Sequence, residues 1–423
     1  MRRSECETNK LGSDSEASEQ LTLGRAALIV LGLLTICSSI SMDIYLPVLP
    51  ALTRDLDASA SQAQLTITAC LLGLALGMLI VGPLSDTYGR RLPLLIGLAG
   101  YVLASLLCAG SPTIATLIVA RFGQGLAAAV GIVTAQAAGR DLYTGDRLTR
   151  YYGRLALLNG LAAVVGPVIG GQLAKITEWR GNFVCLAVFG ALLFLVSLFV
   201  ARETLPPTRR IQSQGLGHRF YDFRTLIRDR LFLGAMLVAG FAQGAIFAYL
   251  AGSTFVLQEY FGLSPQQYAL AFGLNSLGFI ACGLLGATLS VRWTQVGTIA
   301  LGLSSMTIGS TGLLISAIQN FPLQWVSASI FAIVSGVALT VPATTSLAMA
   351  HYRDLAGTAA SVFQSARFGI GCITAPLVGV SGALTAIPFG IVTVCCSILS
   401  LLAFVILLIA ERNREGLVRP ETP

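Results

Sequence analysis

Three charged residues, Asp43, Arg121 and Arg367, stand inside long apolar segments, and the first two have the clearest potential for chemistry. Asp43 lies in the first such segment, a few residues before Pro47, and Arg121 lies in a later one. A carboxylate at membrane depth costs about 2.5–3.5 kcal/mol on insertion scales, so it is a candidate functional group that binds and releases protons. The alternative is that Asp43 lies close enough to a helix end to reach the membrane surface.

Asp43 is also the acidic residue placed most clearly inside an apolar segment. Of the 20 acidic residues, Glu259 and Asp354 fall at segment ends, and the others fall in tails or connecting loops. If a carboxylate couples this protein to protons, Asp43 is nearly the sole candidate. Arg121 lies about eight residues, or about 12 Å, into its segment, because a helix rises about 1.5 Å per residue. This depth is similar to that of Asp43 and allows an ion pair or a water-bridged pair.

The composition identifies the elements that position these residues. The chain has 423 residues, of which 55% are hydrophobic and 11% charged, against about 25% charged in globular domains. Apolar runs of about 20 residues, the length that crosses a bilayer as a helix, recur between short polar breaks. We therefore predict an all-α integral membrane protein with twelve spans. The predicted spans are residues 25–48, 63–84, 93–110, 113–137, 150–173, 181–201, 231–257, 267–290, 293–317, 322–348, 355–381 and 385–410.

The distribution of charge predicts the orientation of these spans. Under this topology nearly all basic loop residues fall on one side, and only Arg54, Lys175 and Arg180 fall on the other. The positive-inside rule then places both termini in the cytoplasm. The net charge of +7 is therefore explained by the basic residues of the cytoplasmic loops, which set the orientation of the spans, and we expect no nucleic-acid partner. The nine cysteines form no CxxC pair, which argues against a zinc site or a disulfide framework.

The chain divides into two halves around a long arginine-rich segment. We predict a cytoplasmic tail (1–24), an N-terminal six-helix bundle (25–201), a central cytoplasmic loop (202–230), a C-terminal six-helix bundle (231–410) and a second tail (411–423). Residues 160–170 resemble residues 369–379 and share a proline. A repeat with an even number of spans per unit implies two parallel halves with a pathway between them.

The loop after the second span carries a spaced motif. It contains Gly82, Asp86, Gly89, Arg90 and Arg91. The glycines permit a tight helix–loop–helix, the arginines anchor the cytoplasmic face, and Asp86 is expected to face a helix N-terminus or an arginine across the interface between the halves. This loop resembles the signature loop of the major facilitator superfamily, although Thr87 replaces a usual arginine.

Two further motifs resemble drug exporters of the same superfamily. The run Arg121-Phe122-Gly123-Gln124-Gly125 is similar to an Arg-x-x-Gln-Gly motif. The run from Gly166 and Pro167 to Gly170 and Gly171 resembles the end of the antiporter motif, although residues 162–163 depart from its earlier Gly-Pro. We expect Pro167 to kink its helix and the glycines to offer a bare surface to the other half. A purely structural kinked helix is the alternative.

Matches along the whole chain resemble the Bcr/CflA group of drug:proton antiporters, and the bicyclomycin resistance proteins in particular. They are residues 43–50, 140–143, 203–207, 357–361 and 367–369. The resemblance implies efflux of a bicyclomycin- or amphenicol-type drug in exchange for protons across the bacterial inner membrane. It places Asp43 in the proton-site position and Arg121 in the position of its partner.

Polar and aromatic side chains in the spans are candidates for the substrate site, because such groups suit amphipathic drugs. They are Tyr45, Gln124, Asn159, Gln243, Phe247, Tyr249, Asn275, Gln364 and Arg367, and each could instead serve helix packing. We expect a monomer in the lipid bilayer whose partners are a small-molecule drug and protons. We expect no enzyme activity, catalytic residue, metal or cofactor beyond the proton gradient. The alternatives are a uniporter or symporter of a polar metabolite, and a membrane scaffold or sensor.

Overall fold

The computed structural model describes residues 25–143, 145–201, 203–205, 226–349, 352, 356–379 and 385–418. The predicted tail 1–24, most of the central loop 202–230 and the last five residues of the second tail lie outside these residues. Within the described residues the chain is helical and contains no strand. The predicted all-α architecture of twelve long helices in two bundles of six is confirmed.

The N-terminal half contains six long helices, and the first of them continues into two short ones. They are α2 (Arg25–Asp43), η1 (Leu46–Val48), α3 (Leu49–Asp55), α4 (Ala60–Tyr88), α5 (Arg91–Ala109), α6 (Ile114–Leu142), α7 (Gly145–Leu173) and α8 (Trp179–Val200). Helix α6 packs against α4, α5 and α2, and α2 also packs against α7 and α8. Several ends are closed by capping boxes, such as Ser59 with Gln62 and Thr113 with Thr116, which satisfy free backbone donors.

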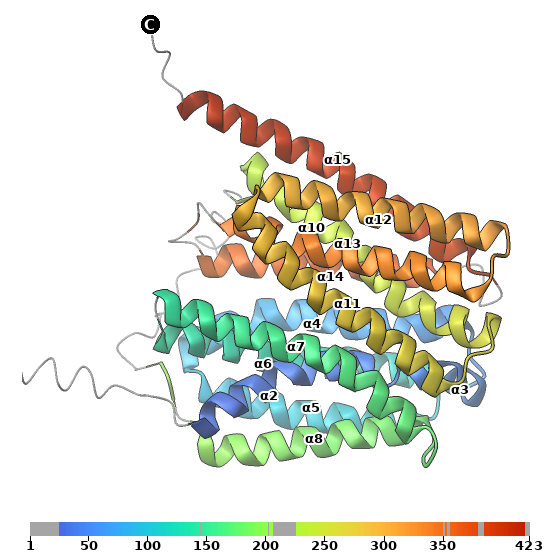
Figure 1. Ribbon diagram of the computed structural model, residues 1–423. Coiled ribbons are helices and arrows are strands. Elements are labelled where there is room, and N and C mark those ends of the chain that lie inside the picture. The colour runs from blue at the N-terminus through green and yellow to red at the C-terminus, as the bar shows by residue number, and fades with distance from the viewer. Residues whose placement is uncertain are drawn as a thin grey trace, which may run out of the picture.

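The C-terminal half repeats this arrangement. Its elements are α10 (Arg230–Phe255), the π-helical turn η3 (Val256–Tyr260), α11 (Pro265–Arg292), α12 (Gln295–Ile318), α13 (Leu323–Met349), α14 (Ala356–Leu377) and α15 (Ile387–Val418). Helix α10 packs against α13, α14 and α15. In Figure 1 the N-terminal half fills the lower part of the view and α10 to α15 the upper part, with α7 and α11 at the junction.

The first predicted span differs from the structure because its helix ends at Asp43. Prolines 47 and 50 lack a donor N–H and clash with the preceding turn, so the chain passes through η1 and restarts as α3. Asp43 is therefore the last residue of α2, and its side chain lies at a helix break.

Eleven described helices are long and apolar enough to cross a membrane, which makes the chain a multi-pass membrane protein. The twelfth, α14, carries Gln364, Arg367 and several small polar residues and is not among the eleven. A helix with charged and polar groups at this depth faces protein or a water-filled space rather than lipid.

The two halves meet mainly along two helix pairs, α4 with α14 and α7 with α11. The amide of Gln64 donates to the carbonyl of Ala251 at 3.2 Å, and Gln266 donates to the carbonyl of Gly171 at 2.8 Å. The thiol of Cys372 lies 3.8 Å from the carbonyl of Thr68. These contacts lie at the end of the molecule that holds α3, at the right in Figure 1. We call it the α3 end, and the opposite end, where α4 passes into α5, the Arg90 end.

Candidate functional site

Asp43 lies inside the protein at the junction of the halves. Its side chain is 6% exposed, and it is the one acidic residue among the described residues that is buried. The structure gives its carboxylate no hydrogen bond or ion pair with any described residue. A buried carboxylate without a partner is costly in its charged form, so this group is suited to take up a proton.

Arg121 is buried completely within the N-terminal half. Its guanidinium donates to the carbonyl of Ser41 at 3.0 Å and to Oε1 of Gln124 at 2.5 Å. It also lies over the ring of Tyr45, 4.4 Å from the centroid, and near the ring of Phe183. Carbonyl dipoles and aromatic faces thus replace a carboxylate as the partners of this charge.

The expected pair between Asp43 and Arg121 is therefore absent from this structure. The two residues do lie at a similar depth, because Arg121 binds the carbonyl two residues before Asp43. However, the guanidinium is directed to the main chain at the end of α2, where a helix leaves carbonyl groups without partners. Arg121 instead positions the helix end that carries Asp43.

The glycines of α7 explain how Asp43 is enclosed. A Cβ atom on Gly166 would lie 3.2 Å from the Cβ of Asp43, and one on Gly170 would collide with the carbonyl of Ile44. Of these motif glycines, Gly171 faces the other half, where a Cβ atom would lie 3.1 Å from that of Ala269. The expectation of a bare surface for the other half is thus wrong for Gly166 and Gly170, which allow α7 to approach α2 instead. Helix α7 continues through Pro167.

Aromatic residues of the C-terminal half complete the surroundings of Asp43. Tyr249 and Tyr268 lie within range of its charge. Tyr249 accepts a hydrogen bond from Asn275 at 3.2 Å and stacks on Phe272, with 5.4 Å between ring centroids. A change in the charge of Asp43, which belongs to the N-terminal half, therefore acts on residues of the C-terminal half.

A second polar cluster joins α14 to α10. Arg367 donates to Oε1 of Gln364 at 2.8 Å and to Oε1 of Gln243 at 2.5 Å. Phe247 packs beside this cluster against Phe368, with ring centroids 5.8 Å apart. Three polar candidates and one aromatic candidate for the substrate site are thus brought together.

The remaining substrate candidates lie elsewhere in the N-terminal half. Tyr45 and Gln124 have no exposed surface and pack with Arg121. Gln124 also donates to Ser105 at 2.8 Å. Asn159 on α7 is partly exposed and accepts a hydrogen bond from Ser39 of α2 at 3.2 Å. In this conformation Tyr45 and Gln124 support Arg121.

The motif loop builds an ionic cluster at the Arg90 end. Arg90 donates to Asp86 at 2.6 Å and to Asp141 at 3.0 Å, so Asp86 pairs within its own loop and not across the interface. Burial lowers the pKa of Arg90, but the hydrogen bonds and charges of Asp141 and Asp86 outweigh this and raise it. Gly89 ends α4 with φ 92° and ψ 170°, a conformation that is open essentially only to glycine.

Two acidic residues of this cluster were not predicted as site residues. The carboxylate of Glu203 accepts hydrogen bonds from the backbone N–H groups of Arg90 at 2.8 Å and Arg91 at 3.4 Å, at the start of α5. Thr204 donates to Asp141 at 3.2 Å. Asp141 and Glu203 lie in two of the stretches that resemble the Bcr/CflA group, residues 140–143 and 203–207. This resemblance was the feature of the sequence that could have identified them as site residues.

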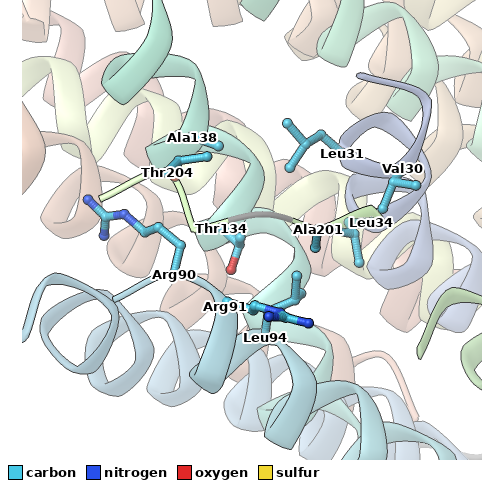
Figure 2. Close-up of a pocket in the computed structure, with 10 residues that line it drawn as sticks. All are labelled: Val30, Leu31, Leu34, Arg90, Arg91, Leu94, Thr134, Ala138, Ala201 and Thr204. Atoms are coloured by element: carbon cyan, nitrogen blue, oxygen red, sulfur yellow. The ribbon is translucent and has the colours of Figure 1, made fainter. Parts of the chain in front are cut away.

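Two cavities lie away from Asp43. Figure 2 shows the first, of about 30 Å³, whose lining includes Arg90, Thr134, Ala138, Thr204 and Leu31; it has room for one or two waters and not for a drug. The second, of about 420 Å³, lies between the halves at the α3 end and is lined by Arg54, Glu178 and Glu259 among others. No group of three metal-ligating side chains occurs in the part of the chain that the structure describes.

Comparisons with known proteins identify transporters as the relatives of this chain. A profile of the Major Facilitator Superfamily matches residues 31–376. YdgK of Bacillus subtilis (strain 168), an uncharacterized MFS-type transporter, is 36% identical over 381 residues, covering 90% of this chain and 94% of its own length. The bicyclomycin resistance protein homolog of Haemophilus influenzae is 28% identical over 396 residues, covering 92% and 97%.

A solved structure shares the fold. The crystal structure of a bacterial homolog of the human lysosomal transporter Spinster, inward-facing and unoccupied, superimposes with a TM-score of 0.69 at 16% identity and covers 91% of this chain and 96% of its own. The resemblance that the motifs predicted is confirmed at the level of the superfamily. On the profile match and the relatives along most of its length, this chain belongs to the Major Facilitator Superfamily.

Proposed function

We propose that this protein is a proton-coupled antiporter that exports small antibiotic-like compounds, of the bicyclomycin or amphenicol type, across the bacterial inner membrane. The family and the fold are those of transporters and not of enzymes. The name of the Haemophilus relative supports a drug as the cargo. The predicted orientation, with both termini in the cytoplasm, and the monomeric state belong to this proposal.

The observation that carries the proposal is the environment of Asp43. It is buried, has no partner among the described residues, and lies where α2, α7 and the tyrosines of α10 and α11 meet. An exchanger needs a group whose proton affinity differs between two conformations. A carboxylate at the junction of two moving halves meets this need, because its surroundings change when the halves rearrange.

The contacts between the halves suggest how exchange proceeds. The hydrogen bonds that join them hold the α3 end together. With the termini in the cytoplasm, as proposed, the α3 end faces outward, and in this scheme cargo enters from the Arg90 end. Drug binding favours loss of the proton from Asp43 to the cytoplasm, the halves rock, and the drug leaves on the outer side. Protonation of Asp43 from outside then returns the empty carrier.

The test is an export assay in a host that lacks its own drug pumps. Cells that produce the wild type should accumulate less chloramphenicol or bicyclomycin than cells that produce Asp43→Asn at equal membrane abundance, and a protonophore should remove the difference. Uptake of a polar metabolite instead of export would favour a uniporter or symporter. Export that persists in Asp43→Asn and in the presence of protonophore would reject proton coupling at this residue.

A further inference from the structure

The cluster of Arg367, Gln243 and Gln364 has an unusual balance of charge. No acidic residue forms an ion pair with Arg367 in the part of the chain that the structure describes, and its Nε is buried without a hydrogen-bond partner. A guanidinium has five N–H donors and no acceptor. The two glutamine carbonyls therefore leave this residue with unused donors and an uncompensated positive charge.

The chemistry of arginine also fixes the orientation of the glutamines. Because Arg367 only donates, the atom that each glutamine turns toward it must be the carbonyl oxygen, as the contacts of Gln243 and Gln364 show. Their NH₂ groups then point away from Arg367, and neither has a hydrogen bond to any described residue. The cluster therefore presents hydrogen-bond donors from three side chains, while Arg367 already engages both glutamine oxygens.

The side chains of the cluster are partly exposed, although most of α10 around Gln243 is buried. Between Val238 and Leu257, every residue is buried except Phe241 and Gln243. Gln364 and Arg367 on α14 are also partly exposed. The rings of Phe247 and Phe368 pack together beside the cluster, and Phe368 is partly exposed, so a molecule bound to the donors would meet an apolar ring next to them.

We infer that this donor cluster is the subsite that selects the substrate class, and that it takes neutral or anionic molecules rich in oxygen acceptors and rejects lipophilic cations. Carbonyl, hydroxyl and nitro oxygens satisfy the free N–H groups of all three side chains. A cation meets the positive charge of Arg367 with no carboxylate to offset it, and like charges at close range are repelled. This inference rests on the proposed function, because it describes the cargo of the same transporter.

The test measures binding to the full-length protein in lipid nanodiscs without any gradient. Chloramphenicol serves as the neutral, acceptor-rich probe and tetraphenylphosphonium as the cation without acceptors. Gln243→Glu places a carboxylate against Arg367 and keeps the side-chain shape, and Arg367→Gln removes the charge. Gln267→Glu is the matched control, since this exposed residue fills the third position of the α11 capping box, where glutamate is equally suitable.

We expect the wild type and Gln267→Glu to bind chloramphenicol and to exclude the cation. Both site variants should weaken chloramphenicol binding by about tenfold or more, the loss expected for hydrogen bonds to a charged group. Gln243→Glu should also gain affinity for the cation. Thermal melting profiles establish that each variant is folded, and the isosteric Gln243→Glu decides the matter if Arg367→Gln does not fold.

Three results would overturn the inference: equal binding of chloramphenicol by the wild type and both variants, equally tight binding of both probes by the wild type, or binding of neither probe. Failure of the proposed function is a separate outcome. Transport at a rate that does not depend on the proton gradient would reject proton antiport but would not affect the inference about binding selectivity. Proton-driven export of lipophilic cations alone would reject only the donor subsite.

Discussion

The guanidinium of Arg121 donates a hydrogen bond to the main-chain carbonyl of Ser41 at 3.0 Å. Ser41 lies in the last turn of α2, whose carbonyls have no partner within the helix, so the positive charge complements the negative end of the helix dipole. Asp43 ends the same helix but has no bond to Arg121. The arginine therefore acts on the proposed proton site through the backbone that carries it.

This relationship predicts that the shape of the Arg121 side chain matters as well as its charge. The guanidinium reaches Ser41 and Gln124 at once, and a lysine ammonium lacks this planar fork. We expect Arg121→Lys to keep the protein folded but to reduce export by about tenfold, since a hydrogen bond to a charged group contributes about 1.5–3 kcal/mol. Arg121→Ala should be worse. Wild-type export rates in Arg121→Lys, measured in everted vesicles, would contradict the dual contact.

Removal of the Asp43 carboxylate should separate drug movement from proton movement. Asparagine has nearly the same shape and no titratable proton, so Asp43→Asn should still exchange drug for drug across proteoliposomes at equal pH. It should lose concentrative transport driven by a pH difference, and drug addition should no longer release protons from the purified protein. The wild type measured in parallel provides the control. Drug-driven proton release that survives in Asp43→Asn would place the proton elsewhere.

The close approach of α7 to α2 predicts a graded response to added methyl groups. A Cβ atom at Gly170 would overlap the Ile44 carbonyl, whereas one at Gly273 of α11 meets its nearest neighbour at 3.9 Å. Gly170→Ala should therefore destabilise the protein by about 1–3 kcal/mol, the usual cost of overpacking, and should reduce export by displacing the end of α2. Gly273→Ala is the control and should leave the melting profile unchanged. Equal behaviour of the two variants would mean that α7 is free to shift.

Much of this site is predictable from the sequence because a charge inside an apolar segment is rare. Asp43, Arg121 and Arg367 stand out for that reason alone, and their burial or partial burial in spans agrees with it. The residues that these charged side chains contact are less predictable. Arg121 bonds to a backbone carbonyl, which every residue possesses, so no residue type marks the contact. The rotation of α7, which turns Gly166 and Gly170 toward α2 and Gly171 toward α11, depends on tertiary packing that the motif spacing does not encode.

The cluster at the Arg90 end predicts an order among its carboxylates. The side chain of Asp141 is 15% exposed and that of Asp86 is 38% exposed, while Arg90 is 9% exposed. Ion pairs are weaker where water screens them, so Asp141→Asn should lower the melting temperature more than Asp86→Asn. We expect a loss of about 1–3 kcal/mol for Asp141→Asn, measured by thermal unfolding in one detergent. The reverse order would show that Asp86 is the main partner of Arg90.

The contact between α4 and α14 at the α3 end provides a test of the opening motion. The thiol of Cys372 lies 3.8 Å from the carbonyl of Thr68, so Thr68→Cys introduces a second thiol on the turn of α4 that Cys372 contacts. Mild oxidation should then form a disulfide that locks the halves together at this end, and export should fall and recover on reduction. Cys70 of α4 also lies within electrostatic range of Cys372, so Thr68→Cys is made in a Cys70→Ala background. The Cys70→Ala protein that keeps Thr68 is the control and should be unaffected by the same treatment. Full export by the cross-linked protein would mean that the α3 end does not open during transport, because a covalent bond across the interface leaves no path between α4 and α14.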